Sequence, residues 1–417
     1  METSDCYDSR FYSRSDLSLS ILPSRLVLRA VLLARFVSAG GDVLAAPYVP
    51  QSESQVLERL PFKANDPVAR ELSELRGQLR RNPRDVNTAV KLARRYYGMV
   101  GEEGDPRYLG YAQAALAPWW NMPEPPLEAQ VMRASIRQFR HDFAGAVHDL
   151  TRALERDPNH PQARSLRAII HIVQARYPQA KEDCGILRKV GDPLIGLGCE
   201  AMVDGLTGNA GPAYDVLNQA YAAAPNESPA KRMWLLIRLG ELAERLDRKQ
   251  AVERHFKDAL ALGIADTFLL AAYADFLLAE NRPAEVVGLL KDKTRSDTLL
   301  LRLVLASRRL NLPTAKELEN ALAARYAAAQ MRGDTTHQQE EARFTLEIRH
   351  DPKKALALAL ENWRVQLEPR DAEIVLEAAI AANDPAAARP VLDWLESTRI
   401  EDKYLQSLGQ QLKGARS

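Results

Sequence analysis

The chain has 417 residues, of which 46% are hydrophobic and only 6% aromatic, so it can bury several cores or one elongated stack of small ones. Lys and Arg together number 56 and Asp and Glu 55, which leaves a net charge of +1. No global field therefore attracts nucleic acid or an anionic membrane, and the composition disfavours both as partners. Ala, Leu, Glu and Arg are frequent and Val-Thr-Ile runs are scarce, which predicts an all-α protein.

The first part of the chain, residues 1–46, is polar at its start and then contains short apolar pieces that end in the small residues Ala45 and Ala46. This pattern resembles a secretory signal peptide with its cleavage site, although Arg35 interrupts the apolar stretch. No uncharged run approaches the roughly 18 apolar residues of a membrane helix, so we expect no transmembrane span. The leader predicts export to the periplasm or envelope, and the alternative is a disordered tail on a cytoplasmic protein.

Residues 47–66 are rich in proline and predict an extended linker. Helical periodicity begins directly after it, where Asp66 and Pro67 form a helix start, and it stops at Pro83. A pair of helices with an unusually Gly-rich connection follows. We therefore expect residues 67–126 to form a capping helix and an irregular first repeat.

A period of about 34 residues begins near residue 127 and predicts a solenoid of helix pairs. Small residues recur where two helices must approach closely, and large ones recur where the second helix begins. The clearest matches are Ala134 with Ala168, Phe143 with Tyr177, and Ala146 with Ala180.

This pattern resembles the tetratricopeptide repeat, in which small residues let paired helices approach, large ones fill the space between them, and a proline ends each unit. Its positions in the first regular unit are Ala134, Phe143, Ala146, Ala153 and Pro158. The resemblance implies a right-handed α-solenoid of antiparallel helix pairs. The repeats are expected to be regular over residues 127–292 and degenerate over residues 293–417, which include a C-terminal capping helix.

The sequence lacks the common catalytic and phosphate-binding motifs, namely Gly-x-x-x-x-Gly-Lys-Ser/Thr, His-Glu-x-x-His and Gly-x-Ser-x-Gly. His141 and His148 have no carboxylate or cysteine at a matching ligand spacing, so they are interpreted as surface or packing residues. We expect a protein that is not an enzyme, binds no metal and needs no cofactor.

Two cysteines lie one helical hairpin apart. Cys184 takes the place that Leu150 has in the preceding unit, so it should face the packed interior, and Cys199 lies on the next helix. Two interpretations stay open: a pair of buried reduced thiols, or a disulfide if the protein is exported.

Trp119 and Trp120 lie between the irregular repeat and the first regular one. They either fill the gap that the long linker leaves or form an exposed docking feature.

In the family that the repeats resemble, the first helix of each pair lines a concave groove. The candidate partner-binding residues on that face are Phe139, Ile169, Ile172, Met202, Leu206, Trp234, Ile237 and Phe268. Such an apolar groove suits an amphipathic helix or an extended apolar peptide. The alternative is a tightly wound solenoid that buries these residues against its own turns.

We therefore expect a non-enzymatic scaffold that binds another protein or peptide through an apolar concave groove. The alternative is a structural subunit of an envelope-associated secretion or assembly complex. Some members of the family hold a partner's terminal carboxylate with Lys, Asn and Arg, but Val131 and Ser135 stand at two of the corresponding places, so that activity is not carried over.

Overall fold

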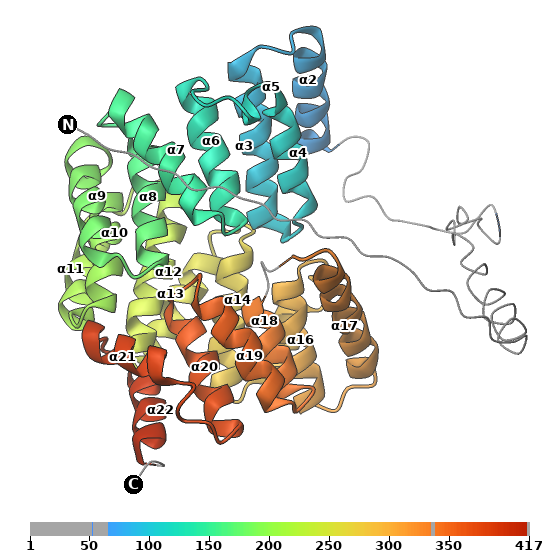
Figure 1. Ribbon diagram of the computed structural model, residues 1–417, viewed down its shortest axis with the longest axis vertical. Helices are drawn as coiled ribbons and strands as arrows, with labels where there is room; N and C mark the ends of the chain where they lie inside the picture. The colour runs from blue at the N-terminus through green and yellow to red at the C-terminus, as the bar shows by residue number, and fades with distance from the viewer. Residues whose placement is uncertain (1–51, 53–65, 335–337, 415–417) are drawn as a thin grey trace, which may run out of the picture. The chain divides into compact units, whose positions relative to one another are not determined.

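The computed structural model describes residue 52 and residues 66–334 and 338–414 (Figure 1). The predicted leader, residues 1–46, lies outside the described residues, as does nearly all of the predicted linker, residues 47–66. Every regular element in the described part of the chain is a helix, which confirms the prediction of an all-α fold. None of these helices combines the length and apolar character that crossing a membrane would need.

The N-terminal helices run from a capping helix through the first regular pairs. They are α2 (Pro67–Arg81), α3 (Val86–Glu103), α4 (Arg107–Ala115), α5 (Ala117–Trp120), α6 (Leu127–Phe139), α7 (Phe143–Arg156), α8 (Pro161–Val173), α9 (Tyr177–Val190), α10 (Pro193–Leu206) and α11 (Ala210–Ala222).

The remaining helices continue the same alternation to the C-terminus. They are α12 (Pro229–Arg245), α13 (Lys249–Leu260), α14 (Thr267–Ala279), α15 (Pro283–Leu290), α16 (Asp297–Arg309), α17 (Ala315–Met331), α18 (Gln338–Glu347), α19 (Pro352–Trp363), α20 (Pro369–Ala381), α21 (Arg389–Thr398) and α22 (Lys403–Gly414).

Most helices begin at a residue that can cap them. Aspartate carboxylates accept hydrogen bonds from backbone N–H groups of the first turn, which would otherwise lack partners, and a proline often follows at the first helical position. The aspartates that do so are Asp66, Asp85, Asp142, Asp192, Asp266 and Asp351. The predicted start at Asp66 and Pro67 is therefore confirmed.

The turn inside each helix pair contains one residue in the left-handed backbone region. Within the described residues this holds for all eight pairs from α6 and α7 to α20 and α21, with φ between 52° and 78°. Only glycine adopts this region freely, and asparagine, aspartate and histidine adopt it more readily than most other residues. The eight are His141, Ala175, Gly208, Asp247, Asn281, Asn311, His350 and Asn383. The repeat thus continues through the C-terminal part, where its side-chain pattern has faded.

A buried ion pair recurs inside the regular helix pairs. Asp149 on α7 accepts two hydrogen bonds, of 2.6 and 2.8 Å, from Arg133 on α6. One repeat later, Asp183 on α9 accepts two of 2.8 Å from Arg167 on α8. Both carboxylates are almost completely buried, with 1% of each side chain exposed. Each of these two helix pairs is therefore fastened by its own arginine fork.

The gap before the first regular pair is filled by tryptophan. Trp119 is buried, Trp120 is half-buried, and Arg133 Nη1 donates to the carbonyl oxygens of both at 3.2 and 2.7 Å. These contacts support the interpretation of the two indoles as a plug rather than as a docking feature.

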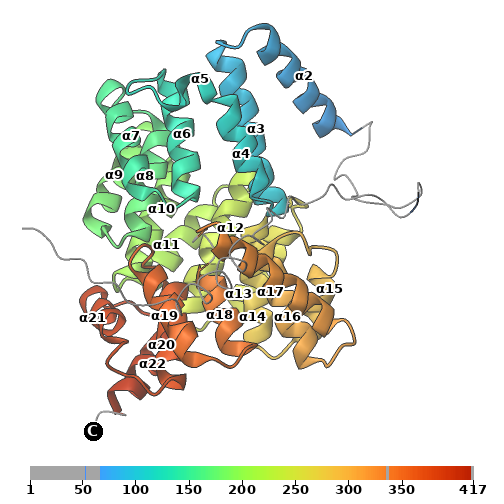
Figure 2. The ribbon, with the colours of Figure 1, turned by 45° about the vertical axis from the view of Figure 1, so that its right-hand side comes forward.

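The C-terminal helices pack back against the middle of the array. One apolar core joins residues of α8, α9 and α10 to residues of α19, α20, α21 and α22. Three hydrogen bonds tie the same parts: Leu367 N–H to the Val173 carbonyl at 2.8 Å, Trp394 Nε1 to the Tyr177 hydroxyl at 3.1 Å, and Gly211 N–H to Glu401 at 3.2 Å. Figures 1 and 2 show the red C-terminal helices next to α11. The solenoid therefore encloses part of its own inner surface.

Candidate functional site on the inner face

The first helices of successive pairs, α12, α14, α16, α18 and α20, turn side chains toward one another across the inside of the array. We call this surface the inner face and define it by Arg238, Phe268, Asp275, Arg343 and Arg370. These residues contact one another across helices that are far apart in the chain. The face is the candidate site because it brings aromatic and charged groups into one enclosed region.

The apolar middle of the predicted groove is not open. Ile172, Leu206 and Ile237 are only 2 to 4% exposed. Ile172 and Leu206 belong to the core that includes Leu376 and Leu392 of the C-terminal helices. For Ile172 and Leu206 the chain itself occupies the groove, because the last helices cover the earlier ones. Ile237 is buried in a separate core that runs from α10 to the end of α18.

The other predicted groove residues keep some contact with solvent. Phe139 is half-buried and lies edge-on to Tyr97, Ile169 packs partly against the core of α6 to α8, and Met202 Sδ lies 3.8 Å from Arg238 Nη1. Trp234 is half-buried, and Phe268 is 44% exposed. The structure thus leaves Phe268 as the most accessible of the eight predicted side chains.

Phe268 is held between two arginines. The guanidinium carbon of Arg238 lies 5.2 Å from the centre of the Phe268 ring, and that of Arg370 lies 5.5 Å from it. Arg238 is also 5.8 Å from the Trp234 ring. Cations at these distances from an aromatic face are attracted by its quadrupole. We call Trp234, Arg238, Phe268 and Arg370 the aromatic–arginine patch.

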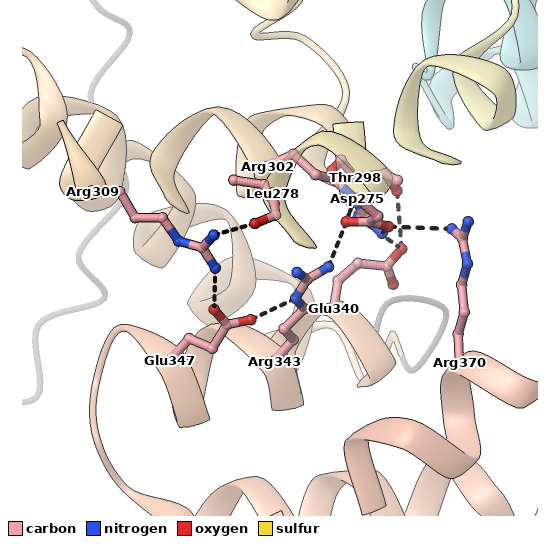
Figure 3. Close-up of polar contacts among 9 residues, drawn as sticks. All are labelled: Asp275, Leu278, Thr298, Arg302, Arg309, Glu340, Arg343, Glu347 and Arg370. Carbon is pink, nitrogen blue, oxygen red and sulfur yellow. Dashed lines mark hydrogen bonds and ion pairs between the residues drawn. The ribbon is translucent and has the colours of Figure 1, made fainter. Parts of the chain in front are cut away.

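Beside this patch, one aspartate gathers arginines from three later helix pairs (Figure 3). Asp275 on α14 pairs with Arg302 on α16 at 2.7 Å, Arg343 on α18 at 2.6 Å and Arg370 on α20 at 3.4 Å. Arg302 is almost completely buried, with 2% of its side chain exposed. We call these four residues the Asp275 hub. It joins four successive first helices through a single carboxylate.

The pKa of Asp275 depends on its burial and on the three guanidiniums around it. Burial opposes ionisation of Asp275, but the three guanidiniums outweigh it and hold its pKa well below its usual range. Arg343 also pairs with Glu347 at 2.6 Å, and Glu347 lies 3.7 Å from Arg309 (Figure 3). Asp275 therefore stays ionised at neutral and mildly acidic pH, and its ion pairs connect the helices that carry the hub.

Other carboxylates on the inner face lie where the helices displace water. Burial raises the pKa of Glu373 to about 8, and the like charge of Glu377 adds to the effect. Burial also raises the pKa of Glu244 to about 7, although its side chain keeps contact with solvent. Glu373 lies less exposed than Glu244, so its raised pKa is the better supported by burial, and it gives the face a charge that depends on pH.

No metal-binding group of three or more His, Cys, Asp or Glu side chains occurs within the described ranges. His141 lies in the left-handed turn between α6 and α7, where its ring stacks on Phe143. His255, which the sequence did not single out, is buried and hydrogen bonds to the Tyr214 hydroxyl at 2.9 Å. These two histidines thus have packing roles.

Cys184 and Cys199 form a disulfide in the structure, with 5.4 Å between their Cα atoms. Both residues are buried in the core that joins the middle helices to the C-terminal ones. The bond links α9 to α10 and therefore connects two successive helix pairs. Of the two arrangements that the sequence left open, the structure contains the bonded one.

The polar part of the inner face has no clear signature in the sequence. Charged residues at helical spacing are usually solvated, and nothing in the pattern around Arg343 or Arg370 distinguishes them from such residues. One signal was present: Asp275 is the only charged residue in the apolar helix α14. A single carboxylate in such a helix needs partners, and these come from helices far along the chain.

No protein-family model matches the sequence, and no curated protein matches it. Among solved structures, the chain is similar to a tetratricopeptide repeat protein from Parabacteroides merdae, with 14% identity, 60% of this chain and 90% of that chain covered, and a TM-score of 0.41. It is also similar to the APC/C hetero-tetramer Cut9-Hcn1, with 13% identity, coverage of 83% and 52%, and a TM-score of 0.39. For yeast Tom70 the identity is 15%, the coverage 78% and 62%, and the TM-score 0.34.

The chain thus spans about half of the Cut9-Hcn1 chain that it matches. The assignment to a tetratricopeptide-like fold rests on the protein's own helix pairs, their repeated turn and their packing.

Proposed function

We propose that the protein is a non-enzymatic scaffold that binds another protein at the aromatic–arginine patch of its inner face. The observation that carries this proposal is Phe268, a large aromatic side chain that is 44% exposed yet held between two guanidiniums. Aromatic residues and arginine are the residue types most often responsible for binding energy at protein interfaces. The patch thus has the composition of a binding site.

The patch is also preorganised. Arg370 is fixed by Asp275, and Arg238 is paired with Glu241 at 3.2 Å, so neither guanidinium is free to move far from the Phe268 ring. A partner that covers Phe268 then loses little side-chain entropy from this side of the interface. The proposal replaces the wholly apolar groove expected from the sequence with a smaller patch of mixed character.

A photo-crosslinking amino acid at position 268 tests the proposal in the native cell. We expect it to link to one protein partner, whereas the same amino acid at the position of Tyr111 should not link to that partner. Tyr111 is a suitable control because it is aromatic, 54% exposed and outside the patch. Equal crosslinking from both positions, or none from position 268, would contradict the proposal.

We further propose that the scaffold works in an oxidising compartment such as the periplasm. What supports this is the signal-like leader together with two cysteines placed within bonding distance. N-terminal sequencing of the protein from the periplasmic fraction is the test, with cleavage near residue 46 expected. A full-length protein found only in the cytoplasm would overturn it. Membership of an envelope-associated assembly stays a prediction.

A further inference from the structure

A cavity of about 370 Å³ opens between α17, α18 and the start of α19, apart from the inner-face patch. Its size is within the range of small-ligand sites in proteins. One wall is aromatic, because Tyr326 and Phe344 meet edge to face with 5.5 Å between their ring centres. Polar groups stand around this wall, and one of them is a carboxylate that makes no ion pair with a described residue.

That group is the carboxylate of Glu341 on α18. Glu341 is only 8% exposed, and its carboxylate accepts a hydrogen bond from the Gln330 side chain. It makes no ion pair with any residue that the structure describes. Burial raises its pKa. Buried carboxylates in proteins are normally paired with a cation, so Glu341 has an unmet need for one.

The two cations at the edge of the cavity do not meet this need. Arg349 is engaged elsewhere: its Nη1 lies 3.0 Å from Glu319, and its guanidinium lies 5.1 Å from the centre of the Phe344 ring. Lys354 is exposed and lowers the pKa of Glu341 only from a distance. The place beside the Glu341 carboxylate is therefore left for a cation from outside the protein.

The floor of the cavity holds a second group without a partner. Tyr326 is 4% exposed, and its hydroxyl has no hydrogen-bond partner among the described residues. Such groups are uncommon in native structures. The cavity thus combines an aromatic wall, which includes the Tyr326 ring, with the Glu341 carboxylate.

We infer that this cavity binds a primary ammonium group, which pairs with the Glu341 carboxylate while its alkyl stem lies along Tyr326 and Phe344. Two sources offer this chemistry: a free linear amine, and the lysine side chain of a peptide. One carboxylate oxygen of Glu341 already accepts a hydrogen bond from Gln330, so a two-pronged guanidinium contact would compete with it. An ammonium ion is a compact point charge with three donors on a flexible stem, and it can pair with the other oxygen alone.

Calorimetric titration of the full chain tests the inference with two probes. Cadaverine represents the free amine, the blocked pentapeptide acetyl-Gly-Gly-Lys-Gly-Gly-amide represents lysine in a peptide, and 1-pentanol is the uncharged control. We expect saturable binding of at least one ammonium probe and none of pentanol. The probe that binds with the higher affinity shows whether the ammonium group comes from a free amine or from a lysine side chain. If neither ammonium probe binds, or if pentanol binds equally well, the inference is overturned.

A charge-removing variant locates the site. Glu341→Gln keeps the shape of the side chain but removes its charge. We expect it to lower the affinity for the better-binding probe by at least about tenfold, because the charge-assisted hydrogen bond to the ammonium group is lost. Glu317→Gln is the matched control, since Glu317 is an exposed carboxylate on the neighbouring helix α17. Unchanged affinity in folded Glu341→Gln would exclude this site.

Proton release gives a second measurement that needs no variant. Burial raises the pKa of Glu341, and an ammonium group paired with the carboxylate should lower it again, so binding in mildly acidic solution should release protons. The groups around Glu341 are Gln330 and Tyr326 on α17, and Arg349, Asp351 and Lys354 beyond α18. Titrations at pH 5 in buffers of different ionisation enthalpy should show protons released, and their absence would contradict a role for Glu341.

Discussion

The regular helix pairs and the C-terminal pairs are held together by arginine and aspartate in different ways. In the regular pairs each carboxylate, Asp149 or Asp183, binds an arginine of its own helix pair. The later pairs instead send three arginines to one carboxylate, Asp275, which lies on the last regular pair. A local fork fixes the geometry of one unit, whereas the hub fixes the winding of several. The Asp275 hub therefore accounts for the regular arrangement of the later pairs, in which the side-chain pattern of the repeat is weak.

Removal of the hub carboxylate should have the largest effect. Asp275→Asn leaves three guanidiniums enclosed without their anion, and we expect it to lower the free energy of unfolding by about 4 kcal/mol in denaturant titrations at pH 7. The pKa of Asp275 is lowered in the folded state, so this contribution is present above about pH 4 and is lost as the pH falls. Asp292→Asn, an exposed position, is the control and should change little.

The same change in a local fork should have a smaller and more confined effect. Asp149→Asn deprives Arg133 and Arg137 of their anion, and we expect a loss of about 3 kcal/mol. Amide hydrogen exchange should increase mainly in α6 and α7. For Asp275→Asn it should increase in α14, α16, α18 and α20 together. The same exchange pattern in both variants would remove the distinction between fork and hub.

The disulfide, like the hub, connects different helix pairs, but it does so through a covalent bond. Replacing both Cys184 and Cys199 with Ala should lower the free energy of unfolding by about 2 to 3 kcal/mol, since the bond closes a loop with a sequence separation of 15. The thermal midpoint under oxidising conditions is the measurement. Wild-type protein in reducing agent should match the variant, and a variant as stable as oxidised wild type would contradict the expectation.

The smallest expected effect concerns a carboxylate that the hub does not neutralise. The pKa of Glu373 is raised to about 8 when folded, from 4.5, so the folded state loses relative stability as the pH rises between these values. Glu373→Gln should therefore be more stable than wild type by about 1 kcal/mol at pH 8, and the difference should vanish near pH 4. Denaturant midpoints at both pH values check this. Glu361→Gln, an exposed position on α19, should show no such trend.

The features that could be predicted from the sequence depend on residues close together along the chain. Ala134, Phe143 and Ala146 pack within one pair, and their spacing was enough to predict helices and solenoid. The enclosure of Ile172 and Leu206 could not be predicted, because it depends on how many pairs complete a turn of the array. That number follows from small angles between pairs, to which no single residue contributes decisively. The same holds for Arg370, whose partners Phe268 and Asp275 lie on a helix about three pairs earlier.

The left-handed residue in the turn of each pair has a consequence for how such a chain can change in length. Because His141, Ala175 and Gly208 hold equivalent places, a segment from one of them to the next is a complete unit with its own turn. Deleting or duplicating that segment rejoins the chain at residues of similar, left-handed backbone geometry. The number of units can thus grow or shrink by whole steps, except where the Asp275 hub binds several units into one.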